Sequence, residues 1–127
     1  HCAVGIGHLA GQISLEKFLL DCKRILKANG LRFIDSGRPV YKLAVMGGAG
    51  SHAIEDAFFA GCDTYVTSDI KYHQFLTAAE LGLNLIDGDH FCEEAPVMPV
   101  LRDKLSAVFQ ETAFLLTNKH HQIIRFA

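Results

Sequence analysis

The sequence predicts an α/β fold, a layered α/β sandwich in which a mixed, largely parallel sheet is flanked by helices. Short apolar runs typical of buried strands alternate along the chain with segments whose apolar residues recur at helical spacing. The connections are short, and glycine or proline occurs in most of them. Such alternation is typical of parallel strands joined by crossover helices. Because 127 residues is the length of one domain, we expect a single α/β domain over residues 1–127.

Each expected element has its own local signal. Apolar and β-branched clusters predict strands over residues 2–6, 31–34, 40–46, 64–67 and 83–86. Amphipathic spacing and end signals predict helices over residues 15–26, from about residue 51 to Gly61, over residues 71–81, and from Pro96 or Pro99 onward. Ser14 is a favourable N-cap for the first of these helices.

Two further predictions concern the ends of the chain. Gly7 and Gly11 indicate a turn after the first strand. Residues 113–116 and 123–126 are interpreted as closing strands of a hairpin, with residues 118–121 as the turn between them.

Composition and charge argue against several classes of protein. The net charge is −2 and no block of basic residues is present, so nucleic-acid binding is not expected. No apolar run approaches the ~20 residues of a membrane span, and no segment resembles a signal peptide. The cysteines are widely spaced and form no Cys-x-x-Cys pair; they are Cys2, Cys22, Cys62 and Cys92. We expect buried, reduced thiols in a cytoplasmic protein.

The strongest candidate site follows the strand expected over residues 83–86. Asp87, Asp89, His90 and Glu94 come directly after it. His90 and Glu94 are four residues apart, so they share one face of a helical turn and can bind a divalent metal ion. A catalytic zinc ion usually has three protein ligands. The remaining ligands must come from elsewhere in this chain, from another subunit or from a segment outside it.

A second polar group, Asp69, Lys71 and His73, follows the strand expected over residues 64–67. Polar residues at strand ends of open α/β sheets commonly line a crevice, which makes Asp69 and His73 catalytic candidates. His73 is interpreted as a ligand, a general acid or base, or a hydrogen-bonded partner of a ligand. Asp69 alone is also a good helix N-cap.

Gly47, Gly48, Gly50 and Ser51 lie in a loop between a strand and a helix. Backbone N–H groups in such a loop can approach a phosphate group, so these residues are candidates for substrate binding. A tight turn explains the same glycines. Residues 48–53 also match the loose Gly-x-Gly-x-x-Ala dinucleotide pattern, which would predict a nucleotide-binding Rossmann-like module.

The remaining histidines have weaker signals. His120 and His121 are adjacent in the expected C-terminal turn, where they are either metal ligands or, more simply, solvated turn residues. His8 and His52 are expected at the surface or in turns.

Several of these segments together resemble one known family, the C-terminal half of the NIF-three-like proteins, also called the type-two GTP cyclohydrolase I family. Gly5-Ile-Gly7 followed by Leu15-Glu-Lys-Phe18 is similar to the segment that opens that half. The motifs that carry the resemblance are Gly47-Gly-Ala-Gly-Ser51, Ile54-Glu-Asp-Ala57, Gly61-Cys-Asp-Thr-Tyr65, Thr67-Ser-Asp-Ile-Lys-Tyr-His73, and Gly82-Leu-Asn-Leu-Ile-Asp87 with His90 and Glu94.

The resemblance implies a site for two divalent metal ions, such as zinc, iron or manganese, with His90 and Glu94 as ligands. It implies that a missing N-terminal half supplies adjacent histidines and an aspartate. The chain, which begins with His1, would then be the C-terminal part of a longer protein. A homo-oligomer, commonly a hexamer, is implied as well, and so is metal-dependent hydrolysis with GTP ring opening as the named activity. The alternative is a non-enzymatic metal-binding scaffold or regulatory interaction protein.

The chain departs from the family pattern at a few positions. Ser68 and Asp89 stand where the pattern has glycine, Gln74 where it has aspartate, and His8 where arginine is usual. The first two departures are expected to alter loop geometry and to leave the ligand types intact.

Overall fold

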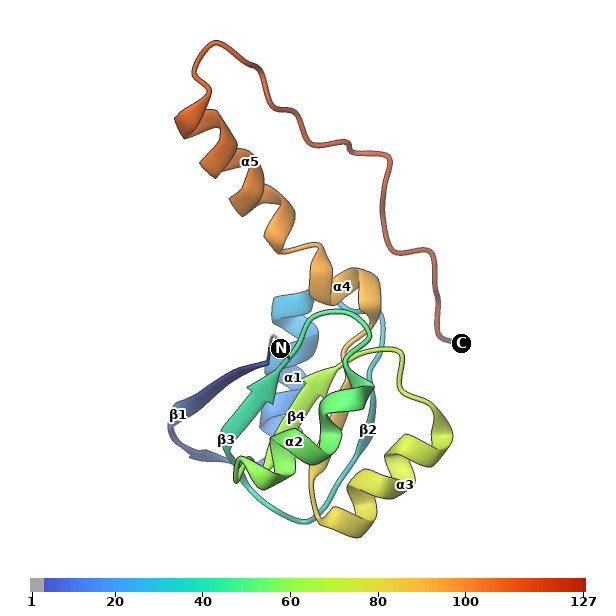
Figure 1. Ribbon diagram of the computed structural model, residues 1–127. Helices are drawn as coiled ribbons and strands as arrows, with labels where there is room; N and C mark the ends of the chain where they lie inside the picture. The colour runs from blue at the N-terminus through green and yellow to red at the C-terminus, as the bar shows by residue number, and fades with distance from the viewer. Residues whose placement is uncertain (1–3) are drawn as a thin grey trace.

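Five strands form one mixed sheet in the computed structural model, which describes residues 4–127 (Figure 1). The three central strands are parallel, and the two edge strands pair antiparallel with their neighbours. The order across the sheet is β1 (Gly5–Ile13), β3 (Val40–Val45), β4 (Thr64–Thr67), β5 (Asn84–Asp87) and β2 (Arg32–Ile34). The expected α/β fold with a mixed sheet is confirmed, and its parallel part is confined to the centre.

Helices cover both faces of the sheet, because successive residues of a strand point to opposite faces. Tyr65 packs into a cluster with Phe75 on one face, and its neighbour Val66 packs with Phe18 on the other. Helix α1 supplies the second cluster, and helices α2 and α3 supply the first (Figure 1). The helices are α1 (Leu15–Leu26), the short 3-10 helix η1 (Ser51–Ala53), α2 (Ile54–Phe59), α3 (Tyr72–Leu81), α4 (His90–Glu94) and α5 (Val97–Val108).

Strands β4 and β5 form the centre of the core. All four residues of each strand are buried, and the two strands pair in parallel register from Thr64 opposite Asn84 to Thr67 opposite Asp87. Their central residues are apolar, and the buried polar residues Thr64, Thr67, Asn84 and Asp87 stand at the strand ends. Their carboxyl ends therefore stop side by side at one edge of the sheet.

The predicted turn at Gly7 and Gly11 is wrong. Strand β1 runs through both glycines and pairs with β3, with a register shift between His8 and Ile13. A Cβ atom at either glycine would meet nothing within 4 Å. An exposed edge strand tolerates glycine at such open positions, particularly beside an irregularity in the pairing. The first two residues of the strand expected over residues 2–6 lie outside the described part.

The predicted C-terminal hairpin is also wrong, since residues 109–127 contain no strand. Two short strands gain little when they pair only with each other and have no sheet or helix to pack on. Here α5 extends away from the sheet, and the chain after it runs back beside the body (Figure 1). No residue of α5 is buried.

Within residues 4–127, the structure has no helix whose length and apolar character would let it cross a membrane.

Candidate metal centre

The candidate site lies where β4 and β5 end. Because Thr67 pairs with Asp87 in the last register position, the residues that follow both strands emerge at the same edge of the sheet. Asp69 follows β4 and His90 follows β5. The sheet therefore brings together two segments that are 21 residues apart in sequence.

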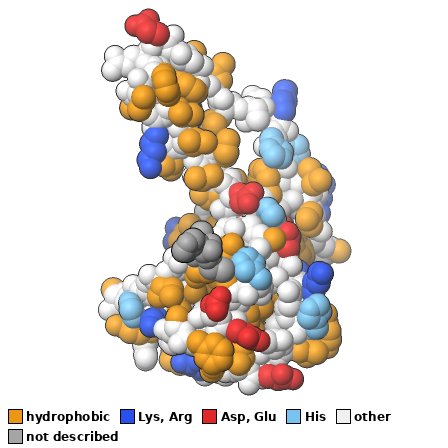
Figure 2. Space-filling model, viewed as in Figure 1, with side chains coloured by type: hydrophobic (Ala, Val, Ile, Leu, Met, Phe, Trp, Pro, Cys, Tyr) orange, Lys and Arg blue, Asp and Glu red, His pale blue; other side chains and the backbone are white. Residues whose placement is uncertain are grey.

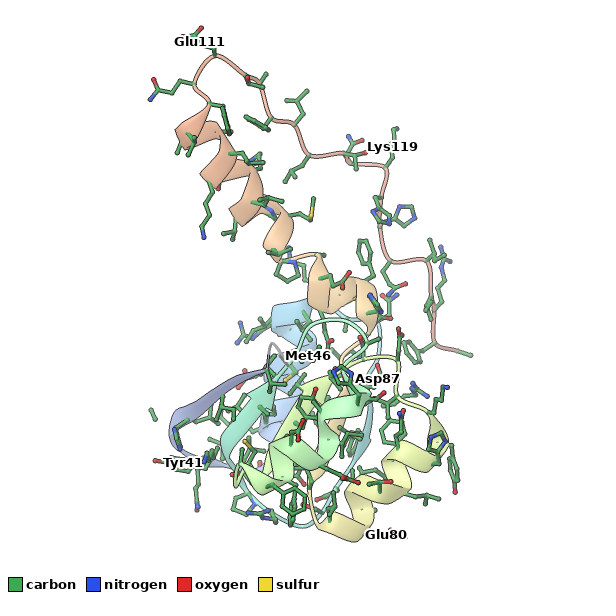
Figure 3. The ribbon with its side chains drawn as sticks, viewed as in Figure 1. Tyr41, Met46, Glu80, Asp87, Glu111 and Lys119 are labelled. Atoms are coloured by element: carbon green, nitrogen blue, oxygen red, sulfur yellow. The ribbon has the colours of Figure 1, made fainter. Side chains whose placement is uncertain are left out.

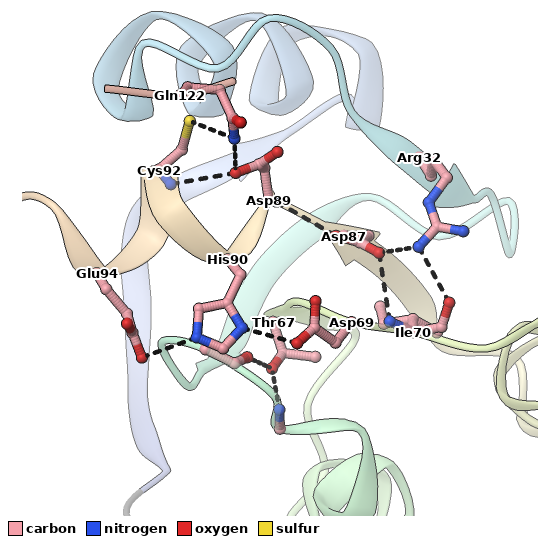
Figure 4. A network of polar contacts seen from close by, with 12 residues as sticks. Arg32, Thr67, Asp69, Ile70, Asp87, Asp89, His90, Cys92, Glu94 and Gln122 are labelled. Atoms are coloured by element: carbon pink, nitrogen blue, oxygen red, sulfur yellow. Dashed lines mark hydrogen bonds and ion pairs between the residues drawn. The ribbon is translucent and has the colours of Figure 1, made fainter. Parts of the chain in front are cut away.

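His90 lies between two carboxylates (Figure 4). Its Nδ1 atom is 2.7 Å from Asp69 Oδ2, and its Nε2 atom is 3.2 Å from Glu94 Oε1. The hydrogen bond with Asp69 raises the pKa of His90 above its usual value, and the charge of Glu94 acts in the same direction. Asp69 fixes the orientation of the ring and leaves Nε2 directed toward Glu94, as a carboxylate partner does for a metal-bound histidine.

A second network fixes the end of β5. Asp87 accepts a hydrogen bond from the Arg32 guanidinium, and its Oδ2 atom lies 3.3 Å from the backbone N of Ile70. Arg32 also donates to the Ile70 carbonyl at 3.0 Å. Asp87 is buried, so Arg32 offsets the cost of burying its charge. This network ties the loop after β4 to strand β5.

Asp89 positions the helix that carries both candidate ligands. Its carboxylate is the N-cap of α4 and accepts a hydrogen bond from Cys92 N at 3.3 Å. Its backbone has φ 72° and ψ 123°, a conformation that favours glycine. The side-chain cap compensates for part of that strain. Asp89 also accepts a hydrogen bond from Gln122 of the C-terminal segment (Figure 4).

The glycine loop packs directly against this centre. Gly48 has φ 74°, and a Cβ atom there would lie 2.6 Å from Glu94 Oε1 and 3.4 Å from His90 Nε2. Gly50 donates its N–H to Thr67 Oγ1 at 3.0 Å, so this group already has a partner. Gly47 is exposed and Ser51 is half-buried. Close packing thus explains Gly48 and Gly50, which were predicted as substrate-binding candidates.

Glu93 was not singled out from the sequence. Both of its carboxylate oxygens are buried, and in the described part of the chain neither they nor Ser68 Oγ has a hydrogen-bond partner within normal geometry. Burial raises the pKa of Glu93 to about 8, while the nearby Ser68 hydroxyl and the N–H groups of Gly48 and Gly88 offset this only in part. A glutamate between Cys92 and a second glutamate, Glu94, gives no sequence signal of burial.

A cavity of about 720 Å³ opens beside the centre. Asp69, His90 and Glu94 line one side of it, and His120 and His121 line it from the C-terminal segment. These two histidines were interpreted more simply as solvated turn residues. Only the tertiary fold places them at this cavity, because no local pattern connects them to strand β5.

The structure brings His90, Glu94 and Asp69 together and leaves His73 apart. His73 is exposed on α3 and does not line the cavity. The donor pair of the His90 imidazole and the Glu94 carboxylate suits a divalent metal ion such as zinc, iron or manganese, with Asp69 as the hydrogen-bonded partner of the imidazole. Among residues 4–127 there is no preformed cluster of three or more ligand side chains. The arrangement therefore fits part of a metal site, and further ligands are needed to complete one.

The chain is similar in sequence to the proteins of one described family. Residues 3–122 match the model of the family described as Duf34/NIF3 (NGG1p interacting factor 3). The chain is 36% identical over 110 residues to a GTP cyclohydrolase 1 type 2 homolog of Bacillus subtilis, which covers 86% of this chain and 29% of that protein. It is 38% identical over 106 residues to one of Nostoc, covering 81% and 40% respectively. The chain thus spans less than half the length of these relatives.

Solved structures show the same fold. A Bacillus cereus protein related to NIF3 superposes with a TM-score of 0.80 at 32% identity, covering 96% of this chain and 35% of that one. Staphylococcus aureus protein SA1388 superposes with a TM-score of 0.79 at 29% identity, covering 95% and 42%. Since the family model spans nearly the whole chain, this protein belongs to the Duf34/NIF3 family.

Proposed function

We propose that this chain is the C-terminal portion of a metal-dependent hydrolase of the type-two GTP cyclohydrolase I class, in which His90 and Glu94 bind a divalent metal ion. One observation carries the proposal: His90 Nε2 and Glu94 Oε1 converge to 3.2 Å at the carboxyl ends of two buried parallel strands. The names of the relatives from Bacillus subtilis and Nostoc support the class of reaction.

Each residue of the centre has a distinct task in this proposal. Asp69 holds Nδ1 of His90 and so presents Nε2 to the metal. Asp89 fixes the first turn of α4 and thereby the relative position of His90 and Glu94. A bound divalent cation would lower the pKa of a water molecule and polarise the attacked bond.

Two ligands do not complete a hydrolytic metal site, which supports a further proposal about the rest of the protein. Additional ligands would come from a segment outside this chain or from another subunit of a homo-oligomer, such as a hexamer. The exposed apolar residues of α5 and of the chain that follows it support such a covering partner; they are Val97, Met98, Val100, Leu101, Val108, Phe109, Leu115, Leu116, Ile123, Ile124 and Phe126 (Figure 2).

The cysteines support a cytoplasmic location. Cys22, Cys62 and Cys92 are buried and unpaired. Free thiols are usual in reducing compartments.

The test is metal analysis of the complete protein together with its activity toward GTP. His90→Ala and Glu94→Ala should each lower the metal content while the fold stays intact, because both side chains are about half exposed. Glu80→Ala, which removes an exposed carboxylate from α3, is the matched control. Unchanged metal stoichiometry in both site variants would contradict the assignment.

The second candidate function is a non-enzymatic metal-binding scaffold, and the exposed apolar face of α5 favours it. The two functions share their ligands and differ in turnover. Release of formate from GTP by the metal-loaded protein supports the hydrolase. Intact, metal-loaded protein without turnover supports the scaffold.

A further inference from the structure

The C-terminal segment, residues 117–126, lies along the cavity beside the metal centre. His120, His121, Gln122, Ile123, Ile124 and Phe126 line this cavity together with His90 and Glu94. Figure 3 shows the chain returning from Glu111 past Lys119 toward the body of the protein. Part of the wall of the cavity therefore comes from a segment that has no regular secondary structure of its own.

Side-chain contacts hold the C-terminal segment in this place. Gln122 donates to the Asp89 carboxylate, and the Asn29 amide donates to the Ile124 carbonyl at 2.5 Å. The Phe126 ring packs on Gly30 so closely that a Cβ atom there would lie 2.8 Å from it. These contacts fix the position of this part of the cavity wall in the absence of a ladder of backbone hydrogen bonds.

Both histidines are anchored at the wall as well. The His120 ring meets the Phe91 ring edge to face, with 5.0 Å between centroids. The His121 Nδ1 atom lies 3.1 Å from the Lys119 carbonyl oxygen. Because a carbonyl oxygen can only accept a hydrogen bond, Nδ1 carries the proton in this contact, and Nε2 is left to bind another partner.

The two walls of the cavity differ in charge. The wall formed by the body carries the carboxylates Asp69, Asp87, Asp89 and Glu94, and one guanidinium, Arg32, which pairs with Asp87. The chain from residue 112 to residue 127 contains none of the 14 acidic residues. It carries the two histidines that line the cavity and two basic residues outside the lining, Lys119 and Arg125. A cation at the acidic wall and the imidazoles opposite would both attract an anion placed between them.

We propose that His120 and His121 bind the phosphate of a phosphate-bearing small molecule whose other end reaches the metal at His90 and Glu94. The imidazole N–H groups donate to phosphate oxygens, and a phosphate group stabilises the charged imidazolium that supplies them. Gln122 acts as a positioning residue, because its hydrogen bond to Asp89 holds both histidines at the cavity. This inference rests on the proposed function only in placing a cation at His90 and Glu94.

Inorganic triphosphate is the probe, and its dissociation constant is measured by calorimetry on the complete, metal-loaded protein. The double variant His120→Ala/His121→Ala should bind it about tenfold more weakly, with unchanged metal content. His8→Ala removes an exposed imidazole on β1, outside the cavity, and should leave the affinity as in the wild type. Equal affinity in the double variant and the wild type overturns the proposal, and so does an equal loss in His8→Ala.

Trypsin tests the positioning role independently, since Lys119 and Arg125 lie in the C-terminal segment. Triphosphate should slow cleavage after both residues in the wild type, as followed by mass spectrometry. Gln122→Leu should accelerate this cleavage several-fold and weaken triphosphate binding, while its metal content stays unchanged. Cleavage that is indifferent to triphosphate in the wild type would show that the C-terminal segment does not contact the ligand.

The two proposals fail in different ways. Absence of metal from the wild type contradicts the proposed function, and triphosphate binding that still depends on His120 and His121 would then leave their role in phosphate binding standing. Normal metal content with no effect of the double variant on triphosphate binding contradicts this inference alone.

Discussion

Gly48 offers the sharpest test of how the glycine loop and the proposed metal centre are coupled. Alanine at this position would have to adopt φ 74°, which costs an L-residue about 1–2 kcal/mol. Its Cβ atom would also lie 2.6 Å from Glu94 Oε1. Because the Glu94 side chain is 57% exposed, it can rotate away from His90 at little cost to stability. Gly48→Ala should therefore displace the Glu94 carboxylate from its position beside His90 without unfolding the protein.

Two measured quantities distinguish backbone strain at position 48 from displacement of the Glu94 side chain. The strain alone should lower Tm by roughly 4–10 °C. Displacement of Glu94 should lower the metal affinity by at least about tenfold. Thermal unfolding monitored by circular dichroism gives the first quantity, and competition with a coloured chelator gives the second.

Gly82→Ala is the matched control for this experiment. Gly82 has φ 72°, and a Cβ atom there would meet nothing within 4 Å. Its alanine variant should show a similar fall in Tm with the metal affinity of the wild type. If Gly48→Ala binds metal as tightly as Gly82→Ala does, the loop does not control the position of Glu94, and the reasoning is refuted.

Three further predictions concern single side chains. Asp69→Asn should lower the metal affinity about 10–100-fold, as measured by chelator competition. Urea unfolding should show little loss of stability, because asparagine tolerates the positive φ at this position and the Asp69–His90 pair is exposed. A metal affinity equal to that of the wild type would contradict a role for Asp69. Burial raises the pKa of Cys22 to about 11. At pH 8, iodoacetamide should therefore modify Cys22 at least ~100-fold more slowly in the folded protein than in the unfolded protein, as followed by mass spectrometry. Equal rates in the two states would show that Cys22 is not buried. The pKa of Glu93 is raised to about 8 from an ordinary 4.5, so the folded state binds its proton more tightly and this group lowers stability as pH rises between these values. In metal-free protein, urea unfolding should show Glu93→Gln to be more stable than the wild type at pH 8.5 and close to it at pH 5. A gain in stability that does not change with pH would contradict this reasoning.

Local sequence patterns were sufficient for most of the elements. Helix α1 begins after Ser14, whose hydroxyl accepts from Lys17 N at 3.2 Å, in agreement with its prediction as an N-cap. Strands β4 and β5 were predicted from short clusters of apolar and β-branched residues, which suit strands that are buried on both faces. The pairing of His90 with Glu94 follows in the same way from their four-residue spacing on one helical turn.

The C-terminal hairpin shows where local patterns fail. Residues 113–116 and 123–126 have the composition of strands, yet neither forms one. A strand requires a partner for its backbone groups, and its own sequence does not say whether a sheet edge lies within reach. The turn predicted at Gly7 and Gly11 was wrong for a related reason, because an exposed edge strand tolerates residues that are typical of turns.

By itself, the sequence determined the class of fold, the central strands and the pair His90 and Glu94, because periodicity and spacing act between neighbours in the chain. Only the tertiary structure decided that Asp69 holds His90, that Gly48 packs against Glu94 and that His121 lines the cavity. These contacts depend on which strands are adjacent in the sheet and on where the C-terminal segment returns. The order of the strands in the sheet and the path of the C-terminal segment back to the cavity are set by packing of the whole domain, so no local stretch of residues encodes them.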